Sequence, residues 1–189
     1  MNNRPIQAED KVFIDANTLL VNSFRLARKI WDSGYRPNYL VGLWRGGTPV
    51  GAAIQEFFRV RGHDPYHTAI KTQSYVGLRQ GGEVEVKGLE HVIDIVESEE
   101  KMLLVDDVFD TGHTLARVLE VIREKARKNT PELRAATIYY KPEKNETDLV
   151  PDYYLIEDNR WLVFPHELDG LTPDEVRRKG LGLFDLVFG

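Results

Sequence analysis

The sequence has no cysteine among its 189 residues, so a disulfide framework and a thiolate metal site are both excluded. No stretch approaches the roughly 20 apolar residues that a membrane-spanning helix needs. Residues 1–10 also lack the apolar core of a signal peptide. These absences favour a soluble protein and permit a reducing compartment, and the cytoplasm is the simplest expectation.

The chain has no surplus of basic residues. Its 25 lysines and arginines stand against 30 aspartates and glutamates, a net charge of -5. This balance argues against a general affinity for nucleic acid or for an anionic membrane surface. An anionic ligand must therefore be held by a local arrangement of groups. The length and the 42% hydrophobic content suit one domain with a well-buried core.

Three familiar ligand-binding patterns are missing. The chain contains neither the Gly-x4-Gly-Lys-Ser/Thr loop nor the GxGxxG fingerprint that bind nucleotide phosphates. His63 and His67 have i, i+4 spacing, but Pro65 between them prevents a helical metal-binding face. We therefore assign no zinc site.

Strands and helices are expected to alternate along the chain. Apolar residues at helical spacing predict a helix over residues 15–31, and Thr48-Pro49 is typical of the start of a second helix that ends near Gly62. Residues 73–88 contain four glycines and indicate a long loop, with a β-hairpin as the alternative. Thr172 predicts one more capped helix. Expected strands span residues 39–43, 66–72, 101–105, 134–140 and 152–156. This order predicts an α/β fold with a mostly parallel twisted sheet flanked by helices.

The segment from Asp106 to Thr114 is the strongest candidate site. It follows an apolar strand and opens a helix, and ligands bind at that place in parallel sheets. Gly112 allows a tight turn, so that backbone N–H groups and the hydroxyls of Thr111 and Thr114 can surround a phosphate. The carboxylates of Asp106 and Asp107 suit the vicinal hydroxyls of a ribose or Mg²⁺.

At this segment the sequence resembles the type I phosphoribosyltransferases. Their signature of two hydrophobic residues, two acids, two hydrophobics, Asp and Thr-Gly reads here Leu104-Val-Asp-Asp-Val-Phe-Asp-Thr-Gly112. The resemblance implies the fold of that family with a small hood, formed mainly by residues about 150–189 of a single domain 1–189. It also implies that Asp106 and Asp107 hold the ribose of phosphoribosyl pyrophosphate. The residues implied for its 5′-phosphate are Asp110, Thr111, Gly112, His113 and Thr114.

Other segments resemble the purine-salvage branch, which includes xanthine-guanine and hypoxanthine phosphoribosyltransferases. Arg45-Gly46-Gly47 matches the loop that holds pyrophosphate, and this loop predicts a cis peptide bond at Trp44–Arg45. Ser74 and Tyr75 stand where the family carries a lid over the reaction centre. Without the resemblance, each of these segments also fits an ordinary turn or surface loop.

Base recognition is also implied by resemblance. Lys141, in Tyr139-Tyr-Lys-Pro142, matches the lysine that approaches O6 of a 6-oxopurine. Trp161 and Leu162 match the residues that stack on the base and read its edge, and Glu167 stands where relatives carry an acid near the metal. From pattern alone, Lys141 could be a solvated lysine and Trp161 part of an apolar core.

The resemblance implies an enzyme that transfers ribose 5-phosphate from phosphoribosyl pyrophosphate to hypoxanthine, guanine or xanthine. Asp110 would be the general base, Arg45 would assist the leaving pyrophosphate, and Asp106, Asp107 and Glu167 are the candidate ligands of Mg²⁺. A homodimer or homotetramer is expected, with no nucleic-acid or membrane partner. The alternative is a regulatory protein that senses phosphoribosyl pyrophosphate on the same fold.

Overall fold

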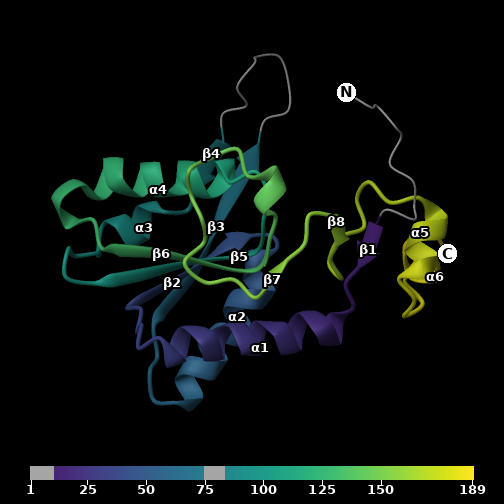
Figure 1. The fold of residues 1–189 in the computed structure, drawn as a ribbon, viewed down its shortest axis with the longest axis horizontal. Helices are drawn as coiled ribbons and strands as arrows, with labels where there is room; N and C mark the ends of the chain where they lie inside the picture. The colour runs from purple at the N-terminus through teal and green to yellow at the C-terminus, as the bar shows by residue number, and fades with distance from the viewer. Residues whose placement is uncertain (1–10, 75–83) are drawn as a thin grey trace. The chain divides into compact units, whose positions relative to one another are not determined.

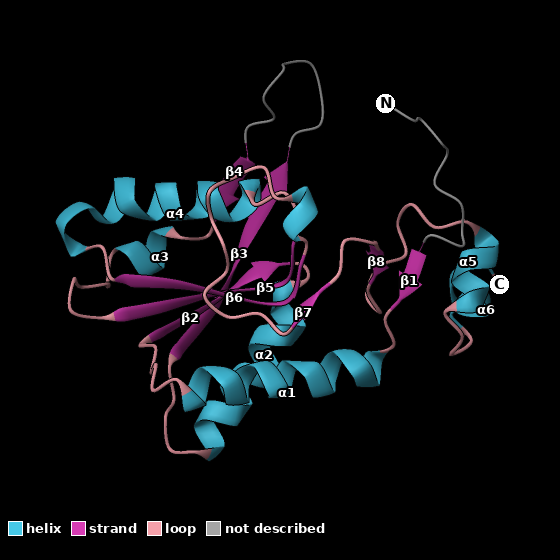
Figure 2. Ribbon diagram, viewed as in Figure 1, coloured by secondary structure: helices cyan, strands magenta, loops and turns pink. Residues whose placement is uncertain are grey.

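The computed structural model describes residues 11–74 and 84–189 and divides into two compact units. The larger unit, Leu20–Asn159, is built on a six-stranded sheet (Figures 1 and 2). The strands are β2 (Tyr39–Trp44), β3 (Tyr66–Ser74), β4 (Val84–Lys87), β5 (Lys101–Phe109), β6 (Glu132–Tyr140) and β7 (Ile156–Glu157). Their order is β4-β3-β2-β5-β6-β7, with β4 antiparallel to β3 and all other pairs parallel. The predicted fold class is confirmed.

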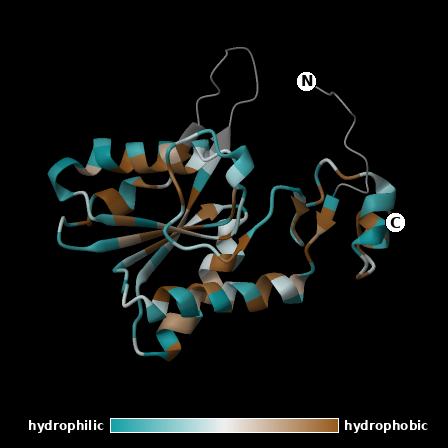
Figure 3. Ribbon diagram, viewed as in Figure 1, coloured by the Kyte–Doolittle hydropathy of each residue, from teal (hydrophilic) through white to brown (hydrophobic). Residues whose placement is uncertain are grey.

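Helices cover both faces of this sheet (Figure 1). The helical segments are α1 (Ala16–Asp32), α2 (Gly47–Val60), α3 (Glu90–Ile93), α4 (His113–Ala126), η2 (Arg127–Asn129) and η3 (Pro142–Lys144). On the face of α3 and α4, Val41 and Leu43 of β2 join a buried apolar cluster with Val118 and Ile122 of α4. On the other face, the rings of Trp31 and Phe58 pack together and join α1 to α2. Figure 3 shows apolar and polar residues alternating along α1 and α4, as expected of helices that bury one side.

The smaller unit includes residues 11–19 and 160–189. Its strand β1 (Lys11–Phe13) pairs in parallel with β8 (Trp161–Val163), and Lys11 lies opposite Trp161. It also holds α5 (Pro173–Arg178) and α6 (Leu183–Phe188). The predicted cap is confirmed, because Thr172 and Glu175 form a reciprocal capping box at the start of α5.

Two expected element boundaries are wrong. Helix α2 begins at Gly47, and no side chain caps it. Thr48 is therefore not the cap, because it lies inside the first turn, where its hydroxyl oxygen is buried. Strand β5 continues to Phe109, whereas a loop was expected from Asp106. The reason is that Val108 and Phe109 still pair with β6, which keeps the acidic pair on the strand.

Two further differences concern the sheet edges. The expected loop over residues 73–88 contains the strand β4, which pairs antiparallel with the end of β3 as the hairpin alternative required. The expected strand 152–156 is reduced to a single bridge between Tyr153 and Ala136, followed by β7. Among residues 11–74 and 84–189, no helix combines the length and the apolar character needed to cross a membrane.

Candidate functional site

Two loops leave adjacent parallel strands at the same end of the sheet. Residues 45–47 follow β2, residues 110–112 follow β5, and these strands pair with Gly42 opposite Val105. The strand order reverses between β2 and β5, because the chain goes from β2 outward to β3 and β4 and then returns to β5. Ligands of open α/β sheets bind at such a switch point, beyond the carboxyl ends of the strands. The fold therefore places the candidate residues where a ligand is expected.

The glycines of the first loop allow close contact with β5. A Cβ atom on Gly46 would lie 2.1 Å from Oδ2 of Asp107, and one on Gly47 would lie 2.0 Å from the carbonyl oxygen of Val105. No larger residue fits at either position without displacing the acidic pair. The predicted cis peptide bond at Trp44–Arg45 is confirmed, and the Arg45 side chain is exposed. The first loop is thus packed directly against the strand that carries the acidic pair.

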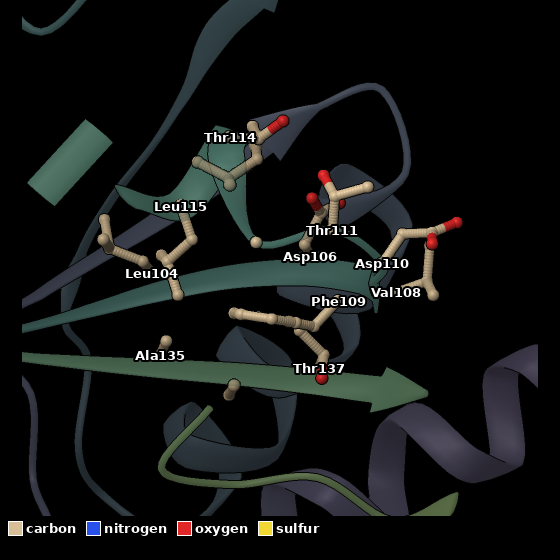
Figure 4. Close-up of a pocket in the computed structure, with 13 residues that line it drawn as sticks. Leu104, Asp106, Val108, Phe109, Asp110, Thr111, Thr114, Leu115, Ala135 and Thr137 are labelled. Atoms are coloured by element: carbon tan, nitrogen blue, oxygen red, sulfur yellow. The ribbon is translucent and has the colours of Figure 1, made fainter. Parts of the chain in front are cut away.

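The second loop turns sharply into α4. Gly112 is the residue before the helix and has φ 87°, a left-handed conformation that glycine adopts without strain. Figure 4 shows Asp110 at the end of β5 and Thr114 at the start of α4. A cavity of about 230 Å³ lies beside this loop. It is lined by Leu43, Leu104, Asp106, Val108, Phe109, Asp110, Thr111, Gly112, Thr114, Leu115, Ala135, Ala136 and Thr137.

The acidic pair lies at the end of β5 and is partly desolvated. Asp107 is buried, and its backbone N–H donates to Oδ1 of Asp106 at 3.0 Å. Burial raises the pKa of Asp106 well above its ordinary value, and the neighbouring charge of Asp107 adds to this effect. A ligand that donates hydrogen bonds, or a cation, would therefore stabilise the ionised form of Asp106.

Lys141 lies at the end of β6, next to the second loop. Its side chain is buried, and its Nζ atom lies 2.6 Å from Oδ2 of Asp110. Its backbone N–H donates to the carbonyl oxygen of Phe109 at 2.9 Å, which fixes the lysine against the end of β5. Lys141 is thus a buried, paired residue and not a solvated lysine at a strand end.

Sequence reasoning missed the residues that support the loop from outside. The backbone N–H of Glu146 donates to the carbonyl oxygen of Thr111 at 3.0 Å, and the Glu146 carboxylate pairs with His113 at 2.8 Å. A Cβ atom on Gly112 would lie 2.5 Å from Oγ1 of Thr147. No motif marks these residues, because they reach the loop only when the chain after β6 folds back.

Thr137 of β6 was also missed. Its hydroxyl oxygen is buried beside the cavity, and among the described residues it has no hydrogen-bond partner. A buried hydroxyl without a partner is costly, so a ligand that bonds to it would be favoured. A threonine within an apolar strand gives no signal in sequence, because it is a common strand former.

The remaining predicted residues lie in the smaller unit or outside the described residues. Trp161 is 46% exposed, whereas Leu162 is buried. Oε2 of Glu167 accepts a hydrogen bond from the backbone N–H of Phe164 at 3.0 Å, so this carboxylate stabilises the turn over residues 164–167. Ser74 ends β3, but its side chain and all of Tyr75 lie outside the described residues. The metal role expected for Glu167 stays a prediction.

The acidic pair fits a divalent cation that is shared with a substrate. Asp106 and Asp107 provide hard carboxylate oxygens, which Mg²⁺ prefers. Within the described ranges, no group of three or more His, Cys, Asp or Glu could hold a metal ion. Mg²⁺ commonly uses one or two carboxylates and completes its shell with water and substrate phosphates. The residues present fit that arrangement and do not form an all-protein cage.

Comparison with known proteins decides the family. A phosphoribosyl transferase domain matches residues 15–169, which include both loops and the Lys141 segment. The chain belongs to this family. A curated relative of this phosphoribosyltransferase is the xanthine-guanine phosphoribosyltransferase of Chromohalobacter salexigens. It is 32% identical over 131 residues, which is 68% of each chain.

Solved structures support the purine branch and the fold. The purine phosphoribosyltransferase from Pyrococcus horikoshii is 28% identical, with a TM-score of 0.63 over 86% of this chain and 98% of its own. The Helicobacter pylori xanthine-guanine-hypoxanthine phosphoribosyltransferase has a TM-score of 0.65 over 84% of this chain and 95% of its own. It is 22% identical and supports the fold alone. The protein is therefore a member of the purine phosphoribosyltransferase family.

Proposed function

We propose that this phosphoribosyltransferase transfers ribose 5-phosphate from phosphoribosyl pyrophosphate to a 6-oxopurine, releasing pyrophosphate and a nucleoside monophosphate. The observation that carries this proposal is the pair of Lys141 and Asp110, with Nζ and Oδ2 2.6 Å apart beside the loop before α4. The pair places a cationic donor and an anionic acceptor side by side. The pair is therefore suited to the edge of a 6-oxopurine that carries O6 and N7.

The two loops suit the phosphorylated donor. The helix α4 begins at the Gly112 turn without a side-chain cap, so the backbone N–H groups of its first turn can surround the 5′-phosphate. Asp106 and Asp107 provide acceptors for the ribose hydroxyls, and Arg45 is an exposed cation for the pyrophosphate group. Because Gly46 and Gly47 bring the first loop against β5, these groups can hold one molecule.

The edge of a 6-oxopurine carries O6, an acceptor, next to N7, which is a donor when protonated. Lys141 can donate to O6 while Asp110 accepts from N7–H. Adenine carries an amino group in place of O6, which would leave the buried ammonium of Lys141 facing another donor. We therefore expect adenine to be rejected. Trp161, 46% exposed, offers a ring on which the base can stack.

In the proposed reaction, N9 of the base attacks C1 of the ribose as the bond from C1 to the pyrophosphate oxygen breaks. The proton on N7 passes to Asp110, which makes Asp110 the general base. Mg²⁺, when bound, would neutralise charge that develops on the leaving pyrophosphate. The carboxylates of Asp106 and Asp107 would favour the positive character of the sugar ring in the transition state.

The proposal is tested by measuring pyrophosphate release from phosphoribosyl pyrophosphate with hypoxanthine, guanine, xanthine or adenine, with and without Mg²⁺. We expect release with at least one 6-oxopurine, only with Mg²⁺, and none above background with adenine. Adenine as the best substrate would remove the assigned role of Lys141. Binding of phosphoribosyl pyrophosphate without turnover on any base would instead favour the regulatory alternative.

A further inference from the structure

The C-terminal residues 170–189 lie beyond the part of the chain that the family matches, which ends at residue 169. They form α5 and α6 in the smaller unit. The same unit holds β8 with Trp161, the ring proposed to stack on the base. The contacts that α5 and the residue after it make with β1 and with the turn after β8 therefore bear on how the base binds.

The first contact is made by Lys179, the residue after α5. Its Nζ atom donates to the carbonyl oxygens of Phe164 at 2.6 Å and Glu167 at 2.5 Å. These two residues also bond to each other, because the N–H of Glu167 donates to the carbonyl oxygen of Phe164 at 3.0 Å. Lys179 thus binds both ends of the turn that directly follows β8. Burial lowers the pKa of Lys179, which agrees with an ammonium held away from water.

The second contact runs through Lys11. The Lys11 Nζ atom lies 2.7 Å from Oε1 of Glu175, and only 11% and 5% of these two side chains are exposed. The same Nζ atom lies over the ring of Trp161, 5.5 Å from its centroid. The ammonium therefore covers one face of the ring, while 46% of the Trp161 residue stays exposed. Glu175 fixes the ammonium, and the ammonium holds the ring by a cation–π interaction.

We propose that Lys179 and the Lys11–Glu175 pair are positioning residues that hold the Trp161 ring and the 164–167 turn ready for the purine. The purine stacks on the face of the ring opposite Lys11. This inference rests on the proposed function, because it assigns these residues to the base site of that reaction. It gives the C-terminal segment a role in base binding and none in binding phosphoribosyl pyrophosphate.

The experiment compares Lys179→Met and Glu175→Gln with the wild type in the full chain. Glutamine at 175 keeps a side-chain oxygen for the capping box with Thr172 while it removes the charge that holds Lys11. Lys128→Met is the matched control, since Lys128 is an exposed lysine in η2. Lys179→Arg tests whether a conservative cation restores the behaviour. Each protein is assayed for KM of the base, kcat, the Kd of phosphoribosyl pyrophosphate and Tm.

We expect the KM of the base to rise about tenfold or more in both variants, because a small misplacement of a binding ring has large effects. The kcat at saturating base and the Kd of phosphoribosyl pyrophosphate should change less than about twofold, because the other loops are untouched. Lys179→Arg should recover most of the loss, and Lys128→Met should behave as the wild type. If Lys179→Met fails to fold, Glu175→Gln decides the outcome.

The results distinguish a failure of the proposed function from a failure of this inference alone. A wild-type chain with no transferase activity would overturn the proposed function and this inference with it. An active wild type whose two variants keep the wild-type KM for the base would overturn the inference alone. An equal loss of affinity for the base and for phosphoribosyl pyrophosphate would also overturn it, because that pattern indicates general structural damage.

Discussion

Lys141 and Asp110 form an ion pair across the ends of two adjacent strands, with Nζ of the lysine 2.6 Å from Oδ2 of the aspartate. The Lys141 side chain is 7% exposed, whereas the Asp110 side chain is 43% exposed. The Asp110 carboxylate is therefore accessible to a ligand, whereas the Lys141 side chain is buried. This difference in exposure suits Asp110 as a general base, which must exchange a proton. It also suits Lys141 as a hydrogen-bond donor, which must keep one orientation.

Asp110→Asn should lower kcat on the order of 100-fold or more, because proton transfer usually contributes that much. Asparagine keeps an oxygen to accept from Lys141 and should leave the Kd of phosphoribosyl pyrophosphate nearly unchanged. Single-turnover kinetics and titration calorimetry measure the two quantities. Asp148→Asn, an exposed aspartate beyond η3, is the matched control. Unchanged turnover would remove Asp110 from the role of general base.

Lys141→Met should raise the KM of the 6-oxopurine by about 10- to 100-fold, the value of one hydrogen bond from a charged donor. The same change should reduce the discrimination against adenine, because the unpaired ammonium is removed. Steady-state assays with hypoxanthine and adenine measure both effects. Lys144→Met, an exposed lysine in the following turn, is the control. Selectivity that survives Lys141→Met would show that another residue reads position 6 of the base.

Much of this site could be predicted from sequence. The run Leu103–Val105 is typical of a buried strand, and the motif that follows it places the acids and the turn. The position of Lys141 beside Asp110 could not be derived from spacing, because it depends on β5 and β6 pairing in register, with Phe109 opposite Tyr140. Only the resemblance to a family indicated it.

The parts that could not be predicted depend on contacts distant in sequence. The pairing of β1 with β8 joins Lys11 to Trp161 through strands of three residues each, too short for a periodic signal. Thr48 was wrongly expected to cap α2, because threonine before proline is typical of a helix start. In the structure, the glycine turn at Gly46 begins the helix earlier, since only glycine allows that approach to Asp107.

Asp106→Asn should change the pH dependence of stability. The pKa of Asp106 is raised in the folded protein above its ordinary value of 3.8, so folding favours the neutral form. The contribution of Asp106 to the free energy of unfolding is fully present below its ordinary pKa. It is lost as the pH rises through the pKa of Asp106 in the folded protein. The variant cannot ionise, so its Tm relative to wild type should increase as the pH rises above the ordinary value of 3.8. A Tm difference between Asp106→Asn and the wild type that stays constant with pH would contradict the assignment.

Gly47→Ala should abolish activity and destabilise the fold by about 1–3 kcal/mol or more, as overpacking usually does. The added Cβ atom would lie 2.0 Å from the backbone oxygen of Val105, which cannot move without displacing the acidic pair. Gly34→Ala is an informative control, because its φ of 81° is also unfavourable for alanine but the space around it is open. We expect Gly34→Ala to lower the free energy of unfolding while kcat is retained. Chemical denaturation and activity assays separate the two effects.

The pair of His113 and Glu146 should make only a small contribution to the binding of phosphoribosyl pyrophosphate. Their ring nitrogen and carboxylate oxygen lie 2.8 Å apart, but 55% and 64% of these side chains are exposed. A solvent-exposed pair contributes less than about 1 kcal/mol, so a double-mutant cycle with His113→Ala and Glu146→Ala should give a coupling below that value. The backbone bond from Glu146 to Thr111 survives both substitutions and should keep the loop in place. A coupling of several kcal/mol in the Kd of phosphoribosyl pyrophosphate would mean that the side-chain pair itself forms part of the phosphate site.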